Sequence, residues 1–266
     1  MLRFEIMPFP KGEEQAAELP EPVRLTVTTS PRHGVDHTLD VAERLRALGH
    51  GVTVHLAARM VRDRDHLETL LGRAAAAGID DLFVVGGDAK EPHGPYAAAQ
   101  DVLEILAEHP LRPQRVGVGA YPEGHPLIDE ATLAAALERK SALADYMATQ
   151  LCFDPDALLR WLRETRARGV TLPLYAGLPG PIERRRLLDI SMKVGVGSSV
   201  RFLRKQRGLM TLLRRPGREA DELREALAPH VGEQGLGLAG FHLFTFNELV
   251  STWRWAQELG QARSVA

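Results

Sequence analysis

The sequence predicts an α/β fold, a (β/α)8 barrel, from two observations. First, eight short apolar runs along the 266 residues are each suited to a buried parallel strand. Second, segments with helical spacing separate most of these runs, and eight parallel strands that alternate with helices can close into a barrel. The predicted strands are residues 2–7, 23–28, 52–55, 81–85, 115–119, 146–150, 171–175 and 237–243.

The segments between the strands carry apolar side chains at intervals of three and four residues, which is typical of helices that cover a sheet. Gly49, Gly78 and Gly169 each follow one such segment, where the end of a helix favours a residue in the left-handed conformation. The predicted helices are residues 36–48, 65–77, 96–107, 129–144, 156–168 and 182–194, with residues 246–259 as the last helix.

Two connections depart from a regular barrel. Residues 10–22, between the first two strands, leave room for only a helical turn or two, so we expect a shortened first helix. Residues 195–235, between the last two strands, are too many for a single helix. Their basic residues indicate at least one extra solvent-facing helix before the last strand: Arg201, Arg204, Lys205 and Arg207.

No internal repeat, low-complexity tract or linker divides the chain, so we expect residues 1–266 to form a single domain. The alternative fold is an open doubly wound sheet, whose glycine signature would begin at Gly117 and Gly119. The third glycine of that signature is missing, and Pro122 interrupts the expected helix start. The barrel is therefore favoured over a dinucleotide-binding sheet.

The composition excludes several classes of protein. The formal net charge of −2 and the pI of about 6.6 arise from charges spread along the chain, so neither nucleic acid nor an anionic membrane is an expected partner. Cys152 is the single cysteine, which excludes an internal disulfide and fits a reducing, cytoplasmic location. We expect no export signal or membrane span, because the amino terminus is interrupted by Glu5 and no apolar run approaches roughly 18 residues.

Polar side chains gather at the predicted strand ends, which meet at one end of a barrel. The mixture of acids, amides, aromatic rings and imidazoles suits an organic cofactor and a polar heteroaromatic substrate. The histidines have no recognisable metal-ligand spacing, so we assign no metal. The residues at or just past strand ends are Glu5, Thr28, His55, Asp88, Tyr121, His125, Gln150 and Tyr175.

Two of these acids have both a functional and a structural interpretation. A carboxylic acid that loses hydration in a barrel interior can hold its proton near neutral pH and act as a general acid, which fits Glu5. Glu5 could instead pair with an arginine or lie at an exposed strand end. Asp88 follows two glycines, where an acid more often completes a turn or caps the next helix.

Taken together, the motifs resemble the methylenetetrahydrofolate reductase family. No single motif is decisive, but YPEGHP at 121–126, followed by TQLCFD at 149–154 and FHLFTFN at 241–247, is specific in combination. The matching segments span nearly the whole chain: residues 4–8, 27–28, 54–56, 87–88, 120–126, 138–140, 148–154 and 240–247.

The resemblance implies a barrel that holds FAD at the carboxyl ends of its strands. It implies that NAD(P)H reduces the flavin, and that 5,10-methylenetetrahydrofolate then receives the hydride and becomes 5-methyltetrahydrofolate. By the same resemblance, Glu5 is the acid that helps open the five-membered ring to an iminium, and Asp88 lies beside flavin and folate. The matching flavin-contacting positions are Thr28, His55, Gly87, Asp88, Tyr121, His125 and Lys140, and the matching substrate-contacting positions are Gln150 and Phe244.

Three positions depart from the family pattern. The family usually has an arginine where this chain has Gly86, a tyrosine at Phe244 and an arginine at Glu248, so polar contacts to flavin diphosphate and substrate are lost. These changes leave open weak flavin binding, a flavin-free reductase that takes hydride directly from NAD(P)H, and a different folate-like substrate. A competing hypothesis is a non-catalytic folate-binding barrel subunit. The acids at Glu5 and Asp88 argue against this competing hypothesis. The sequence does not fix the nicotinamide preference or the oligomeric state, and a homo-oligomer stays open.

Overall fold

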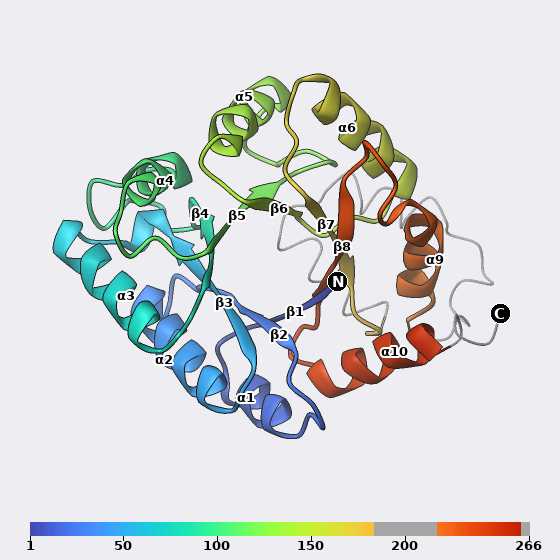
Figure 1. The fold of residues 1–266 in the computed structure, drawn as a ribbon, viewed down its shortest axis with the longest axis horizontal. Coiled ribbons are helices and arrows are strands. Elements are labelled where there is room, and N and C mark those ends of the chain that lie inside the picture. Colours follow the sequence, from blue (N-terminus) through green and yellow to red (C-terminus); the bar gives the residue numbers. More distant parts are fainter. Residues whose placement is uncertain (184–216, 262–266) are drawn as a thin grey trace.

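Eight parallel strands close into a barrel in sequence order, which confirms the predicted fold class. The computed structural model describes residues 1–183 and 217–261. Each strand pairs with the next, and β1 pairs with β8 to close the ring (Figure 1). The strands are β1 (Leu2–Ile6), β2 (Arg24–Val27), β3 (Gly51–Ala57), β4 (Asp81–Val85), β5 (Arg115–Ala120), β6 (Tyr146–Thr149), β7 (Leu174–Pro179) and β8 (Leu238–Phe244).

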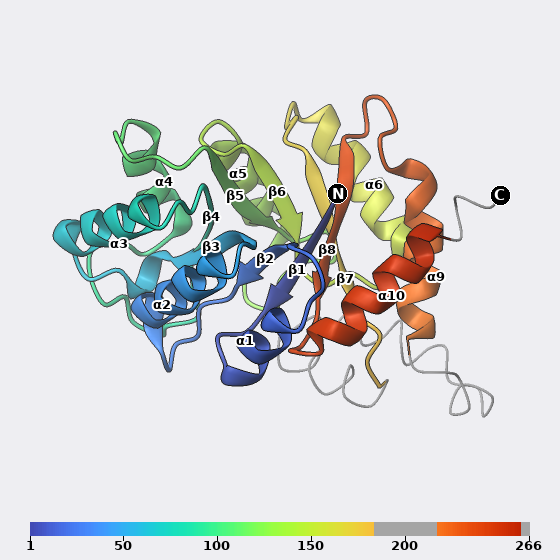
Figure 2. The ribbon, with the colours of Figure 1, turned by 60° about the horizontal axis from the view of Figure 1, so that its bottom comes forward.

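The helices lie around the outside of the strands (Figures 1 and 2). They are α1 (Pro10–Ala17), α2 (Gly34–Ala47), α3 (Arg64–Ala76), α4 (Ala99–Ala107), α5 (Glu130–Ser141), α6 (Pro155–Ala167), α9 (Arg218–Leu227) and α10 (Leu249–Gln261), with single 3-10 turns at Ala58–Met60 and Ala228–His230. None of these helices has the length and apolar character that a bilayer crossing requires.

The two irregular connections have different outcomes. The first helix, α1, has only eight residues, as expected from the short connection. Before the last strand, α9 occupies part of the long connection. The predicted helix 182–194 lies outside the described residues except for its first two, which are not helical, and the four basic residues of the predicted extra helix also lie outside.

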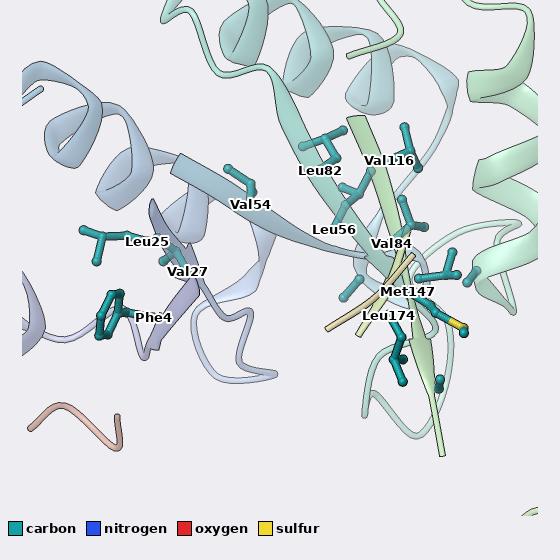
Figure 3. Close-up of a cluster of buried hydrophobic side chains, with 14 of the residues drawn as sticks. Phe4, Leu25, Val27, Val54, Leu56, Leu82, Val84, Val116, Met147 and Leu174 are labelled. Atoms are coloured by element: carbon teal, nitrogen blue, oxygen red, sulfur yellow. The ribbon is translucent and has the colours of Figure 1, made fainter. Parts of the chain in front are cut away.

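The hydrophobic core lies between the barrel and its helices. Alternate strand residues face outward, and most strands give two or more apolar side chains to the layer between barrel and helices. Figure 3 shows members of this layer from six strands, and their side chains are all buried: Phe4, Leu25, Val54, Leu82, Val116 and Met147. Because the outward positions are apolar, the inward positions are free to carry polar side chains.

The predicted limits of the strand at 171–175 are wrong. The observed strand, β7, begins three residues later, at Leu174, and continues to Pro179. Pro173 has no backbone N–H to donate to a ladder, so it precedes the strand. The glycine and proline that follow are typical of a turn, yet all six residues of β7 are buried. At Gly177, a Cβ would lie 2.5 Å from the carbonyl oxygen of Thr149, so the neighbouring backbone requires glycine there.

Helix boundaries follow local backbone chemistry. The left-handed glycines expected after three helices are confirmed, with φ of 94° at Gly49, 66° at Gly78 and 87° at Gly169. The last helix, α10, begins at Leu249 rather than at residue 246, because Phe246 and Asn247 have left-handed φ values of 52° and 59°.

A polar network fills the amino-terminal end of the barrel. Arg3 of β1 crosses to β4, where its Nη2 lies 2.8 Å from Oδ2 of Asp81, and both side chains are almost wholly buried. Arg3 Nη1 donates to the hydroxyl oxygens of Thr53 (3.1 Å) and Tyr146 (2.9 Å), and the Tyr146 hydroxyl donates to Asp81 Oδ1 (2.8 Å). Gly117 gives the Tyr146 ring the space that a Cβ would occupy. This network, the barrel floor, ties four strands together.

Asp81→Asn tests the energetic weight of the barrel floor. Removing the carboxylate leaves the Arg3 guanidinium buried without its counter-charge, so we expect the free energy of unfolding to fall by about 3–5 kcal/mol in urea titrations. The matched control is Glu13→Gln, which removes an exposed pair with Arg44 and is expected to cost less than about 1 kcal/mol. Equal costs for the two variants would show that the buried pair has no special role.

Candidate functional site

A second polar layer lies above the barrel floor, toward the end at which the strands terminate, here called the mouth. Inward positions alternate along each strand, so Glu5 follows Arg3 on β1, and His55 follows Thr53 on β3. Phe83 of β4 stacks on His55 with ring centroids 4.9 Å apart. His242 of β8 completes the layer, with its ring centroid 6.4 Å from that of Phe83.

Glu5 lies between two imidazoles. Its Oε2 is 2.9 Å from Nε2 of His242 and 3.8 Å from Nε2 of His55, so only His242 is within hydrogen-bond distance. The Glu5 side chain keeps 15% of its surface exposed, whereas that of His242 keeps 4%. No arginine of the described residues pairs with Glu5, and the largely buried carboxyl group does not lie at an open strand end.

Two imidazole nitrogens of this layer are buried without a hydrogen-bond partner among the described residues: Nε2 of His55 and Nδ1 of His242. Burial lowers the pKa of His55 to about 4, so its ring is neutral at physiological pH. Buried polar atoms without partners are uncommon in folded proteins. The unpartnered nitrogen of His55 is a feature that a bound polar ligand can satisfy.

A second group of predicted residues gathers at the ends of β4 and β5. Tyr121 packs edge-on against His125, with ring centroids 5.3 Å apart. Burial and the nearby charge of Asp88 raise the pKa of Tyr121, so its hydroxyl stays protonated. Asp88 is exposed. The N–H groups of Ala97 and Ala98, just before helix α4, donate to the carboxylate of Asp101 in the first turn of that helix, so Asp88 does not cap it.

Lys140 reaches this group from helix α5. Its Nζ donates to the carbonyl oxygen of Gly119 at 3.3 Å. Burial, with a smaller effect of Arg139, lowers the pKa of Lys140 to about 8. No carboxylate among the described residues forms an ion pair with Lys140, so an anionic ligand at the mouth would meet a cation that the protein leaves unneutralised.

Glycines leave room beside these side chains. Gly87 has φ of 92°, and a Cβ there would lie 2.9 Å from the Cβ of Ala57, so both conformation and space require glycine. Gly119 faces Tyr121, whose hydroxyl would be 3.5 Å from an added Cβ. Gly86 meets nothing within 4 Å and has no positive φ. Gly86 thus faces open space, whereas the space beside Gly87 is filled by Ala57 of β3.

The remaining predicted residues lie on other strand ends of the same mouth. Thr28 follows β2, and its N–H donates to the carbonyl oxygen of Ile6 at 3.0 Å, next to Glu5. Gln150 follows β6, and its Oε1 accepts from the N–H of Leu151 at 2.8 Å, which leaves its amide NH2 for a ligand. Phe244 of β8 contacts His242 edge-on at 5.1 Å. The ten predicted site residues therefore lie at or near the carboxyl ends of seven strands and on helix α5. Tyr175, which was expected at the same mouth, lies near the start of β7, where its ring packs against that of Tyr146 in the barrel floor.

Sequence reasoning missed three residues of this region. His242 and Phe83 face the barrel interior. For a closed barrel, the alternation of inward and outward residues along β8 and β4 predicts this position. Glu123 accepts from the N–H groups of Phe153 (2.6 Å) and Asp154 (3.0 Å), and it thereby fixes the loop after β5 to the loop after β6. Its position within YPEGHP was the available signal.

Cys152 and the metal assignment complete the chemistry of the site. The Cys152 thiol is buried, donates to the carbonyl oxygen of Gln150 at 3.1 Å, and has a pKa raised far above its usual range by burial, so it is not a nucleophile. Among the described residues, no group of three histidine, cysteine or acidic side chains is arranged to hold a metal ion.

A family model and the curated relatives agree on one family. A family model described as methylenetetrahydrofolate reductase matches residues 11–194. The probable methylenetetrahydrofolate reductase (NADH) of Oryza sativa subsp. japonica is 24% identical over 282 residues, covering 92% of this chain and 45% of the rice protein. Methylenetetrahydrofolate reductase (NADH) 1 of Arabidopsis thaliana is 25% identical over 285 residues, with coverage of 92% and 45%. The chain spans less than half the length of these two relatives.

One solved structure has a similar fold. It is an uncharacterized protein from Clostridium thermocellum that binds two copies of 5-methyl-5,6,7,8-tetrahydrofolic acid. The TM-score is 0.65 at 14% sequence identity, and the match covers 96% of this chain and 95% of that chain. At this identity the likeness is one of fold.

The buried amine of Lys140 predicts a pH-dependent stability. The pKa of about 8 in the folded chain lies below the value of about 10.4 for an unfolded chain, so unfolding takes up a proton between these values. Stability contributed by this group therefore rises with pH across that window, by less than about 1.4 kcal/mol per pH unit. Urea unfolding of the wild type minus that of Lys140→Met, at pH 7.5, 8.5 and 9.5, should show this rise. A difference that does not change with pH would mean that the amine is solvated.

Proposed function

Because the chain belongs to the methylenetetrahydrofolate reductase family, we propose that it reduces 5,10-methylenetetrahydrofolate to 5-methyltetrahydrofolate with NAD(P)H, through bound FAD. The observation that carries the proposal is Glu5, a carboxyl group inside the barrel mouth within hydrogen-bond distance of an imidazole. The proposed product is the compound that the C. thermocellum protein of similar fold binds.

Glu5 would supply the proton that the reaction consumes. Protonation of one ring nitrogen breaks its bond to the bridging carbon, and the other nitrogen then carries that carbon as an iminium. Hydride adds to the iminium carbon, which becomes the methyl group, and the Glu5 carboxylate recovers a proton from solvent. A carboxylic acid in a barrel interior, shielded from most of the solvent, is suited to this role.

The group at the ends of β4 and β5 fits a flavin. Gly86 faces open space beside the backbone, and Lys140 can meet an anionic group. The Nε2 of His55, which has no hydrogen-bond partner among the described residues, can contact a polar ring atom. When bound, FAD supplies a two-electron carrier between NAD(P)H and folate. The residues that would hold it are Thr28, His55, Gly87, Asp88, Tyr121, His125 and Lys140.

Folate would bind over the same mouth. The amide NH2 of Gln150 can donate to a ring nitrogen or carbonyl of the pterin, because its Oε1 is already used by the backbone of Leu151. Asp88 is exposed beside Tyr121, so its carboxylate can accept from the amino groups of the pterin. Phe244 contributes an apolar ring face.

A flavin-free reductase that passes hydride directly from NAD(P)H is the second candidate, and one observation favours it. Gly86 contributes no cation to a flavin diphosphate. The nearby Arg59 does not replace it, because its guanidinium donates to the carbonyl oxygens of Ala89, Lys90 and Ala97 and so shapes the loop after β4. The conformation of Gly86 would accept an arginine, so the missing charge is a feature of this sequence and not a steric necessity.

Absorbance spectroscopy separates the two candidates. We expect the protein, purified or reconstituted with FAD, to show flavin absorbance that NAD(P)H bleaches in the absence of oxygen, if the residues proposed to hold flavin do so. The control is apoprotein stripped of flavin, which should lose folate reduction. Full activity of the stripped protein, together with no FAD binding by calorimetry, would contradict reduction through flavin and favour direct hydride transfer from NAD(P)H to folate.

Glu5→Gln separates proton delivery from hydride delivery. The amide keeps the shape of the side chain but cannot deliver a proton, so we expect folate reduction to fall by a factor of at least about 100. Reduction of bound flavin by NAD(P)H needs no acid and should stay within a fewfold of the wild type. Anaerobic stopped-flow absorbance measures both rates, with Glu13→Gln as a control acid on the surface. Equal loss of both half-reactions in a folded, flavin-bound variant would contradict the acid assignment.

A further inference from the structure

His242 is the one protein group among the described residues within hydrogen-bond distance of the Glu5 carboxylate. We propose that His242 is the positioning residue for proton delivery, holding Oε2 of Glu5 so that Oε1 carries the proton to the substrate. The inference rests on the proposed function and extends it to a residue of β8 to which neither the sequence motifs nor the comparisons assign a role.

The tautomer of His242 follows from its surroundings. Its Nε2 faces Oε2 of Glu5 at 2.9 Å, while its Nδ1 is buried and has no hydrogen-bond partner within residues 1–183 and 217–261. A neutral imidazole carries one proton, and a buried N–H without an acceptor is costly. The proton therefore belongs on Nε2, where it is donated to Oε2 of Glu5. In the protonated acid, this leaves Oε1 to carry the proton.

His55 cannot take over this function. Its Nε2 is 3.8 Å from Oε2 of Glu5, beyond hydrogen-bond distance, and its ring is fixed by stacking on Phe83. The two imidazoles also differ in their place in the proposed function, since His55 belongs to the flavin-contacting set. His242 is enclosed by the rings of Phe83 and Phe244, which contact it at 6.4 Å and 5.1 Å between centroids.

The backbone around the pair is held on both strands. Beyond β8, the hydroxyl of Thr245 donates to the carbonyl oxygen of Glu5 at 2.6 Å. The side chain of Asn247 accepts from the N–H of Met7 at 2.8 Å and donates to the carbonyl oxygen of Met7 at 3.2 Å. These contacts fix β1 against β8, so the distance between His242 and Glu5 is set by the closure of the barrel rather than by two free rotamers.

Two substitutions test the proposal. His242→Gln retains an N–H donor at the position of Nε2, whereas His242→Leu has none. We expect kcat for folate reduction to fall at least about tenfold in the leucine variant and to recover by several fold in the glutamine variant, while the dissociation constant for NAD(P)H stays within about twofold of the wild type. His109→Gln is the matched control, because the buried ring of His109 pairs with the partly exposed carboxylate of Glu68 outside the barrel (2.7 Å) and its replacement should change neither quantity.

A spectroscopic measurement tests the pairing without turnover. In ¹⁵N NMR of histidine-labelled protein, we expect one signal of an imidazole protonated at Nε2 to be absent from His242→Leu and to shift in Glu5→Gln, while the Nε2–H signals of the other buried histidines stay unchanged. Unchanged folate reduction in a folded His242→Leu variant would overturn the proposal. An equal loss of activity in the leucine and glutamine variants would also overturn it. If the wild type reduces no folate, the proposed function and this role both fail, and the NMR result then reports only the pairing.

Discussion

Closure of the ring between β1 and β8 is the constraint on which the site depends. The first and last strands of the chain meet in register, with Glu5 opposite Phe244, and only then does His242 come within reach of Glu5. The closure requires unusual backbone: Phe246 and Asn247 both adopt left-handed conformations, and a Cβ at Gly240 would overlap the backbone of Met1. Such conformations cost free energy, which the hydrogen bonds of Thr245 and Asn247 to β1 offset.

The barrel interior holds two polar layers of different composition. In the floor, the buried charges of Arg3 and Asp81 pair, and the Tyr146 hydroxyl bonds to both, while Nε of Arg3 is buried with no hydrogen-bond partner in the described part of the chain. In the layer above, His55 and His242 each keep one buried nitrogen to which no described residue hydrogen-bonds. Only the upper layer lies toward the strand ends and brings a carboxyl group, Glu5, between two imidazoles. We therefore assign the proposed chemistry to the upper layer, with the floor beneath it.

Sequence periodicity was enough to predict the barrel because each strand is a short apolar run between helical segments, and the strand Asp81–Val85 was predicted at its observed limits. Prediction was wrong at β7, where Pro173 excludes the expected start, and at α10, where two left-handed residues delay the helix. The strand-end rule placed Glu5, Thr28, His55 and Gln150 at one mouth. It could not reveal the pairing of Glu5 with His242, since residues 237 positions apart in the chain meet only through closure of the ring.

The central claim is that the protein reduces the one-carbon unit of a folate bound at the mouth of the barrel, beside Glu5. A ¹³C NMR experiment tests this claim directly. The protein is incubated anaerobically with FAD, NAD(P)H and 5,10-methylenetetrahydrofolate labelled with ¹³C at the bridging carbon. The account predicts that the methylene resonance is replaced by a methyl resonance, with one NAD(P)H oxidised per methyl group formed. A methylene resonance that persists while the folate binds would contradict reduction and identify a binding barrel.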